Sequence, residues 1–101
     1  MALTERQLRF LRGKAHGLRP VVMLGHKGVT ENVVAETLQA LRAHELIKIR
    51  VRAAARAQRE ALLADLVTRA ACTLVTRIGH VAVLYRAATP IPRLVLPDAQ
   101  V

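Results

Sequence analysis

Residues 20–51, PVVMLGHKGVTENVVAETLQALRAHELIKIRV, decide the fold that we predict. The run 21–24 is apolar throughout and lies between Pro20 and Gly25, which is typical of a short strand buried on both faces. A glycine loop, Gly25-His26-Lys27-Gly28, follows it. Thr30 is then the predicted N-cap of an amphipathic helix that ends near residue 44. The stretch therefore predicts a strand, a loop and a helix in succession.

Residues 46–52 alternate strictly between apolar and basic side chains, which predicts a strand with one buried face and one cationic face. Ile47, Ile49 and Val51 form the first set, and the second set is Lys48, Arg50 and Arg52.

The flanking segments extend this pattern in both directions. Thr4 and Gln7 have the spacing of a capping box, and apolar residues at helical intervals predict a helix over 4–16. A second apolar stripe predicts a helix over 55–70. Residues 73–78 and 81–86 are expected to form two strands joined by a glycine turn at 79–80. The prolines beyond residue 86 exclude a further long element, although residues 94–96 could add a short edge contact.

The fold class that follows is α/β. We predict one compact domain with element order α-β-α-β-α-β-β, in which the early strands need crossovers and the last pair is antiparallel. The four strands should form a mixed sheet packed with helices, in a domain that covers residues 1–97 and leaves 98–101 as a C-terminal tail. A chain of 101 residues is long enough to bury a core without disulfides or metal.

The net charge indicates the kind of molecule that the protein binds. Sixteen Lys and Arg residues oppose seven Asp and Glu residues, which gives a net charge of +9. All of the cations except Lys14, Lys27 and Lys48 are Arg, whose planar guanidinium binds phosphate with two parallel hydrogen bonds. The expected partner is therefore a nucleic acid. Phe10 and Tyr85 are the only aromatic residues besides His, so binding should depend on backbone charge and RNA shape more than on base stacking.

Enzymatic and membrane functions find little support in the sequence. The four His residues lack metal-ligand spacing, no carboxylate pair suggests acid–base work, and the single Cys72 excludes an internal disulfide. We expect no enzyme activity, no metal, no cofactor, no small-molecule substrate and no membrane partner. The expected location is the cytoplasm, and the expected state is a monomer.

The glycine loop is the sharpest local feature. Between a strand and a helix start, glycines let a ligand approach the backbone, and free amides with the helix dipole favour an anion. A tight strand-to-helix connection can also need glycine for conformational reasons alone. Arg12, Lys14 and His16 precede the same strand, which favours a phosphate-binding role, although His16 is expected mainly as a packing or capping residue.

Four motifs together resemble the CRM family, the chloroplast RNA splicing and ribosome maturation domain. They are Ala15-His16-x-Leu18-x-Pro20, Gly25-x-x-Gly28, His44-Glu45-Leu46-Ile47-Lys48 and Leu84-Tyr85-Arg86, and the resemblance extends over about residues 4–97. It implies a domain similar to the C-terminal domain of translation initiation factor three. It also implies RNA binding through the glycine loop, as in stand-alone, YhbY-like bacterial members that associate with precursors of the large ribosomal subunit.

We therefore predict an RNA-binding assembly factor whose partner is ribosomal RNA in precursor large subunits. The predicted RNA-binding residues are Gly25, His26, Lys27, Gly28, Arg12, Lys14, Arg6, Arg9 and Arg86. Two alternatives stay open. One is a general nucleic-acid binder of the nucleoid type, and the other is a protein-interaction module of the ribosome whose basic side chains, including those at 48, 50, 52, 56 and 59, only face solvent.

Overall fold

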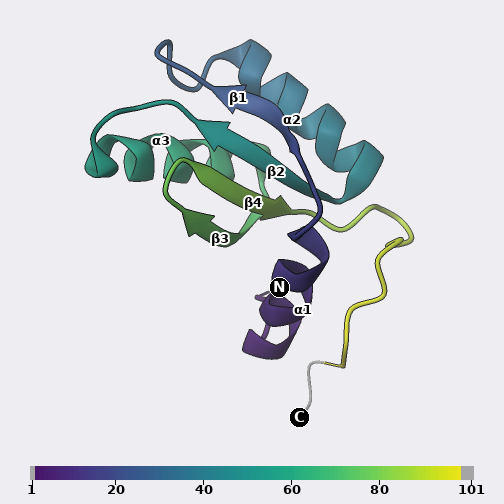
Figure 1. The fold of residues 1–101 in the computed structure, drawn as a ribbon. Helices are drawn as coiled ribbons and strands as arrows, with labels where there is room; N and C mark the ends of the chain where they lie inside the picture. The colour runs from purple at the N-terminus through teal and green to yellow at the C-terminus, as the bar shows by residue number, and fades with distance from the viewer. Residues whose placement is uncertain (1, 99–101) are drawn as a thin grey trace.

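Four strands form one mixed sheet, and helices lie on both of its faces (Figure 1). The computed structural model describes residues 2–98. The strand order is β1-β2-β4-β3, with β1 parallel to β2 and the other two pairs antiparallel. The predicted element order and sheet type are confirmed. The elements are α1 (Glu5–Ala15), β1 (Pro20–Leu24), α2 (Glu31–His44), β2 (Leu46–Val51), α3 (Arg56–Ala70), β3 (Thr73–Ile78) and β4 (Val81–Tyr85).

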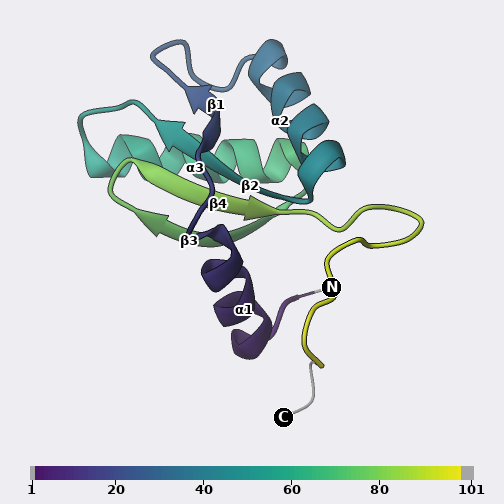
Figure 2. The ribbon, with the colours of Figure 1, turned by 45° about the vertical axis from the view of Figure 1, so that its right-hand side comes forward.

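The main hydrophobic core lies between the sheet and the pair α2 and α3, and α3 passes behind the strands in Figure 2. The three apolar residues of β2 that alternate with cations point into it, and Ile49 is completely buried. Leu63 and Leu66 of α3 cover the same face. The alternation of β2 was therefore interpreted correctly, because a period of two places every second side chain on one face.

The opposite face of the sheet carries a second, smaller core. Leu11 and Ala15 of α1 pack there against Leu46, Val83 and other side chains of the last strands. This cluster covers only part of the face, because α1 packs mainly on β2 and β3, and Val21 and Met23 of β1 stay exposed. The fold thus has one fully covered face and one half-covered face.

The prediction that residues 21–24 are buried on both faces is wrong. Val22 and Leu24 are buried, but Val21 is 50% exposed and Met23 is 45% exposed. The physical reason is position, since β1 is an edge strand and α1 lies over other strands. An uninterrupted apolar run does not reveal which neighbour is missing.

The predicted helix starts are confirmed by their caps. The Thr4 hydroxyl accepts a hydrogen bond from the Gln7 amide at 3.1 Å, and the Gln7 side chain accepts one from the Thr4 amide at 3.0 Å. Thr30 accepts from the Val33 amide at 3.2 Å. Each cap satisfies a helix N–H group that has no partner within the helix.

Glu45 joins the C-terminal segment to the sheet. It directly follows α2 with φ of 63°, and its side chain is completely buried. The carboxylate accepts hydrogen bonds from the backbone amides of Ala88 at 2.5 Å, Leu94 at 2.7 Å and Arg93 at 2.9 Å. Burial alone raises the pKa of Glu45, but these three donors and the Arg93 charge outweigh it, so the pKa lies below its usual value. Glu45 is therefore a charged anchor for the tail.

The tail contains no strand within the described residues, so the short edge contact expected at residues 94–96 does not form as a sheet pair. Leu94 and Leu96 instead pack against the second core, and the Gln7 side chain donates to the Pro97 carbonyl at 3.2 Å. The expected boundary at 97–98 stays a prediction, because residues 99–101 lie outside the described part. No described helix has the length and apolar character needed to cross a membrane.

Candidate nucleic-acid interface

The glycine loop forms a tight turn between β1 and α2. The Gly28 amide donates to the Gly25 carbonyl at 3.1 Å, and the Thr30 amide donates to the Gly28 carbonyl at 3.1 Å. His26 and Lys27 occupy the two central positions of the turn, and both are exposed. The loop therefore presents one ring and one ammonium group outward from a fixed backbone.

The two glycines of the loop differ in backbone conformation and in the space around them. Gly28 has φ of 75°, a conformation that side chains disfavour, and a Cβ there would lie 3.6 Å from Leu62 Cδ2. Gly25 is not in that region, and a Cβ added to it would meet nothing within 4 Å. Conformation thus accounts for Gly28, but no neighbour and no backbone angle accounts for Gly25.

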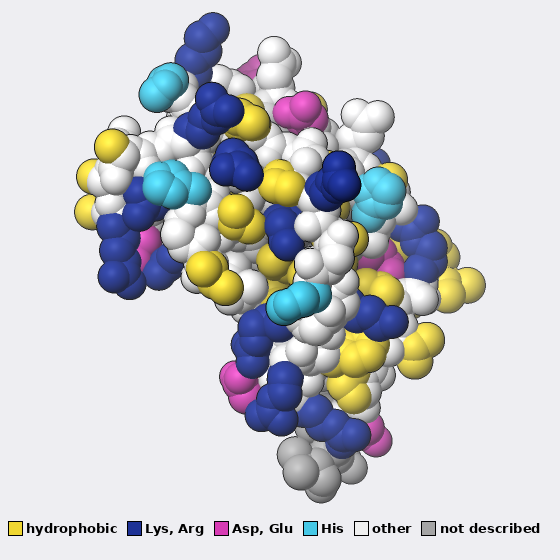
Figure 3. All heavy atoms as spheres, in the orientation of Figure 1, with side chains coloured by type: hydrophobic (Ala, Val, Ile, Leu, Met, Phe, Trp, Pro, Cys, Tyr) yellow, Lys and Arg dark blue, Asp and Glu magenta, His cyan; other side chains and the backbone are white. Residues whose placement is uncertain are grey.

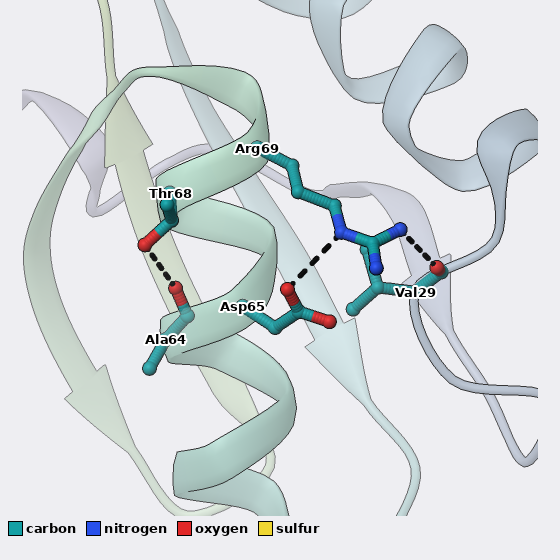
Figure 4. A network of polar contacts seen from close by, with 5 residues as sticks. All are labelled: Val29, Ala64, Asp65, Thr68 and Arg69. Carbon is teal, nitrogen blue, oxygen red and sulfur yellow. Dashed lines mark hydrogen bonds and ion pairs between the residues drawn. The ribbon is translucent and has the colours of Figure 1, made fainter.

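Arg69 of α3 binds the backbone at Val29, the residue directly after the glycine loop, as Figure 4 shows. Its Nη1 donates to the Val29 carbonyl at 2.9 Å, and its Nε donates to Asp65 Oδ1 at 3.1 Å. Only the Asp65-to-Arg69 spacing of four residues hinted at an ordered guanidinium.

The same end of the sheet carries further basic groups. The Arg52 amide donates to the Leu24 carbonyl at 2.8 Å, which places Arg52 beside the loop. Arg59 Nη1 donates to the carbonyls of Ala53 and Ala54 and lies 3.3 Å from His80 Nε2. The loop, the segment after β2 and the turn between β3 and β4 therefore meet at one end.

The part of the sheet that α1 leaves uncovered is called the open face here, and it consists of Val21, Met23, Lys48, Arg50, Ile78 and Val81. The strand register aligns Met23, Arg50, Val81 and Ile78 in one row across all four strands. None of the four strands contains Asp or Glu. Figure 3 shows this side, where Lys, Arg and His side chains lie among hydrophobic ones and the carboxylates lie toward the periphery.

Two of the predicted α1 residues border the open face. Arg12 and Lys48 line one hollow beside the end of α1, and Lys14 and Lys48 line another. Arg12 Nη2 also contacts Glu5 Oε1 at 3.1 Å, and Lys14 Nζ lies 5.5 Å from the centre of the Phe10 ring. Lys14 lies at the start of β1 and the glycine loop follows its end, whereas Arg12 lies over β3 and β4, so the two predicted groups come from different parts of the sheet.

The other predicted residues lie apart from this surface or at its border. Arg6 and Arg9 are exposed on α1. Arg86 follows β4 at the end of the sheet away from the loop, where its amide donates to the Glu45 carbonyl at 2.9 Å and its Nη1 to the Ala70 carbonyl at 3.5 Å. Of the two roles expected for His16, the capping role is confirmed, because His16 is the C-cap of α1 and its amide donates to the Gly13 carbonyl at 3.3 Å. Its side chain is exposed and lines the hollow with Arg12, so it does not pack in a core.

The titratable groups do not assemble a reactive centre. Burial raises the pKa of the Cys72 thiol to about 11, an effect that the nearby Arg86 charge only partly offsets. Burial, followed by the Glu45 charge, also raises the pKa of Tyr85. Within residues 2–98, no group of three or more His, Cys, Asp or Glu side chains is placed to hold a metal ion.

Comparison with known proteins identifies the family. A model of the CRS1/YhbY (CRM) domain matches residues 3–86. The chain belongs to the CRS1/YhbY (CRM) domain family. This confirms the resemblance drawn from the four motifs.

Relatives in the CRM family share most of their length with this chain. An RNA-binding protein of Haemophilus influenzae is 46% identical over 83% of this chain and 85% of its own length. The probable RNA-binding protein YqeI of Bacillus subtilis is 37% identical over 94% of this chain and 99% of its own. The solution structure of a hypothetical Staphylococcus aureus protein, described as a candidate RNA-binding protein, covers 95% of this chain with a TM-score of 0.81 and 31% identity. The CRM fold is thus shared along almost the entire chain.

Proposed function

We propose that this protein binds structured RNA through the glycine loop and the open face, and that it assists assembly of the large ribosomal subunit without catalysing a reaction. The observation that carries the proposal is the open face itself, a sheet surface with cations on β2 and no acidic residue on any strand. Lys27 in the glycine loop, Lys14 at the start of β1 and Arg12 over β3 and β4 add positive charge around this face. Such a surface complements a phosphate backbone.

Gly25 supports the role of the loop. No atom lies within 4 Å of the place that a Cβ of Gly25 would occupy, so the backbone there is open to close approach by a ligand. Exposed Lys27 adds a charge where the start of α2 already favours an anion. The relatives that are named RNA-binding proteins support RNA as that anion.

The ribosomal part of the proposal draws on the family to which the chain belongs and on the way such a surface recognises RNA. Phe10 is partly packed and Tyr85 is only 5% exposed, so neither offers a platform for a run of bases. Recognition by backbone charge and shape suits folded RNA, of which precursor ribosomal subunits are rich sources. Arg6, Arg9 and Arg86 are proposed only as outer phosphate contacts.

Sedimentation of a cell lysate through a sucrose gradient tests the proposal. The protein should migrate with precursors of the large subunit at low salt and should leave them after nuclease treatment or on Lys27→Glu substitution. The matched control is Arg42→Glu, which makes the same charge change at an exposed position of α2, on the covered side of the sheet. It should still co-migrate.

The two alternatives predict different outcomes. A nucleoid-type binder would bind duplex DNA as tightly as folded RNA and would spread over all nucleic acid in the gradient. A protein-interaction module would keep its place in the gradient after nuclease treatment, and its binding would not depend on salt. RNA binding through phosphates should instead weaken with a log–log salt slope of roughly 0.7 for each phosphate contact.

A further inference from the structure

A hollow lies where α1 ends and β1 and β2 begin, at the end of the open face away from the glycine loop. Its volume is about 340 Å³. Its apolar lining comes from four parts of the chain: Leu18 before β1, Val21 on β1, Leu46 and Ile47 on β2, and Leu94 of the tail. Because Glu45 fixes the amide of Leu94 at 2.7 Å, the tail wall of the hollow is held in place.

Basic side chains complete the hollow. Lys14, Arg19, His44 and Lys48 are its only other lining residues among those described, and no carboxylate borders it. Lys14, Arg19 and His44 are exposed, whereas Lys48 is partly buried. A ligand that fits this arrangement has an apolar, planar part and carries negative charge on its outer side.

We propose that this hollow receives one unpaired nucleotide of the bound RNA, with the base against the apolar lining and the flanking phosphates at Lys14 and Lys48. The inference rests on the proposed function and specifies its partner as RNA that contains a bulged or extruded nucleotide. Unpaired bases in RNA commonly stack on His rings and Arg guanidinium planes. His44 and Arg19 supply one of each, from different elements.

Size and composition favour this occupant over others. A volume of about 340 Å³ lies at the small end of the range for ligand sites, roughly 300–1,000 Å³. It suits a single nucleotide and excludes a helix or a duplex. Phe10 and Tyr85 are packed in the second core, and His44 is the one ring among the residues that line the hollow.

Binding of two RNA hairpins provides the test, one fully paired and one identical except for a single bulged adenosine. The wild-type protein should bind the bulged hairpin about tenfold more tightly, as expected from the stacking of one base. Val21→Glu places a carboxylate in the hollow and should reduce this ratio to about one. The matched control Met23→Glu changes the same charge on the same strand and face, outside the hollow, and should weaken both complexes while keeping the ratio.

His44→Ala is a second variant at an exposed position that carries little risk for the fold, and it should reduce the ratio at least threefold. Equal wild-type affinities for the two hairpins, or an unchanged ratio in Val21→Glu and His44→Ala, would overturn the inference and leave the proposed function standing. Failure of the wild type to bind either hairpin would instead refute the proposed function. Free adenosine monophosphate is titrated as well, and binding as tight as that of the bulged hairpin would assign the hollow to mononucleotides and overturn the inference.

Discussion

Replacement of Glu45 by Gln should destabilise the protein strongly, although the two side chains have nearly the same volume. The carboxylate accepts from Ala88 and Arg93 at Oε2 and from Leu94 and Arg93 at Oε1. An amide has one oxygen, so in either orientation its NH2 group faces a backbone donor. One buried N–H without an acceptor costs about 1–3 kcal/mol, and the loss of charge-assisted bonding adds to it. We expect a total of about 2–4 kcal/mol.

Urea unfolding followed by circular dichroism measures this loss, which is a large fraction of the roughly 5–15 kcal/mol typical of a domain. Amide hydrogen exchange should accelerate at Ala88 or Leu94, whichever of the two amides faces the NH2 group of the substituted side chain instead of an oxygen. The melting temperature should fall by roughly 10–25 °C at this chain length. Ala88→Pro removes one of the same donors and is a useful companion variant.

The pH dependence of the difference provides the sharpest check. The pKa of Glu45 is lowered in the folded state, so its contribution is complete above the unfolded value of about 4.3 and is lost as the pH falls through the folded pKa. The stability of wild type and Glu45→Gln should therefore converge in acid. A loss below about 0.5 kcal/mol at pH 7, or a difference that stays constant into strong acid, would refute the anchoring role.

Three further predictions concern single positions. Gly25→Ala should leave the free energy of unfolding within about 0.5 kcal/mol of wild type, yet it should weaken RNA binding. Gly28→Ala should lower the free energy of unfolding by about 1–2 kcal/mol, because its φ is positive. Equal effects of the two substitutions on stability would contradict the distinction between the two glycines. Ala71 ends α3 with φ of 50°, so Ala71→Gly should stabilise the fold by about 1 kcal/mol in urea unfolding, and a destabilisation would count against strain there. Cys72, with a pKa of about 11, should react with iodoacetamide far more slowly in the native protein than in urea at pH 8, and similar rates would show that burial does not protect it.

The sequence predicted the elements well because each depended on a local signal. The capping residues Thr4 and Thr30 located two helix starts within one residue, and the alternation around Ile49 identified both its strand and the buried face. The glycine turn at Gly79, where φ is 58°, was equally local. These patterns need no information about distant neighbours.

The features that were missed depend on partners far along the chain. Met23 could not be recognised as exposed, because the run around it has the composition of a central strand and only the sheet order makes β1 an edge. The anchoring role of Glu45 was not predicted, since its donors lie 43 to 49 residues later in the chain. Arg69 reaches a carbonyl 40 residues earlier. Long-range pairing of this kind leaves no periodic trace in the sequence.

The candidate site was anticipated in part. The composition and the loop indicated a basic surface near Lys27, and the structure places the loop residues as neighbours in a single turn. It could not be foreseen that β1 lies between the loop and Lys14, nor that Lys48 lines two hollows of the open face. Both facts depend on where α1 packs, which a helical pattern alone does not determine.

The anchoring of the tail by Glu45 has a consequence for synthesis of the chain. Translation produces Glu45 well before Ala88 and Leu94, whose backbone amides donate hydrogen bonds to the Glu45 carboxylate in the folded protein. During that interval a carboxylate destined for burial has only water to bond with, and β2 still lacks its neighbour β4. The nascent protein therefore cannot complete the wall of the hollow or bury this charge until the segment after β4 has left the ribosome. A nascent chain that still holds this segment inside the ribosome lacks the donors to Glu45 and the tail side chains Leu94 and Leu96 of the second core.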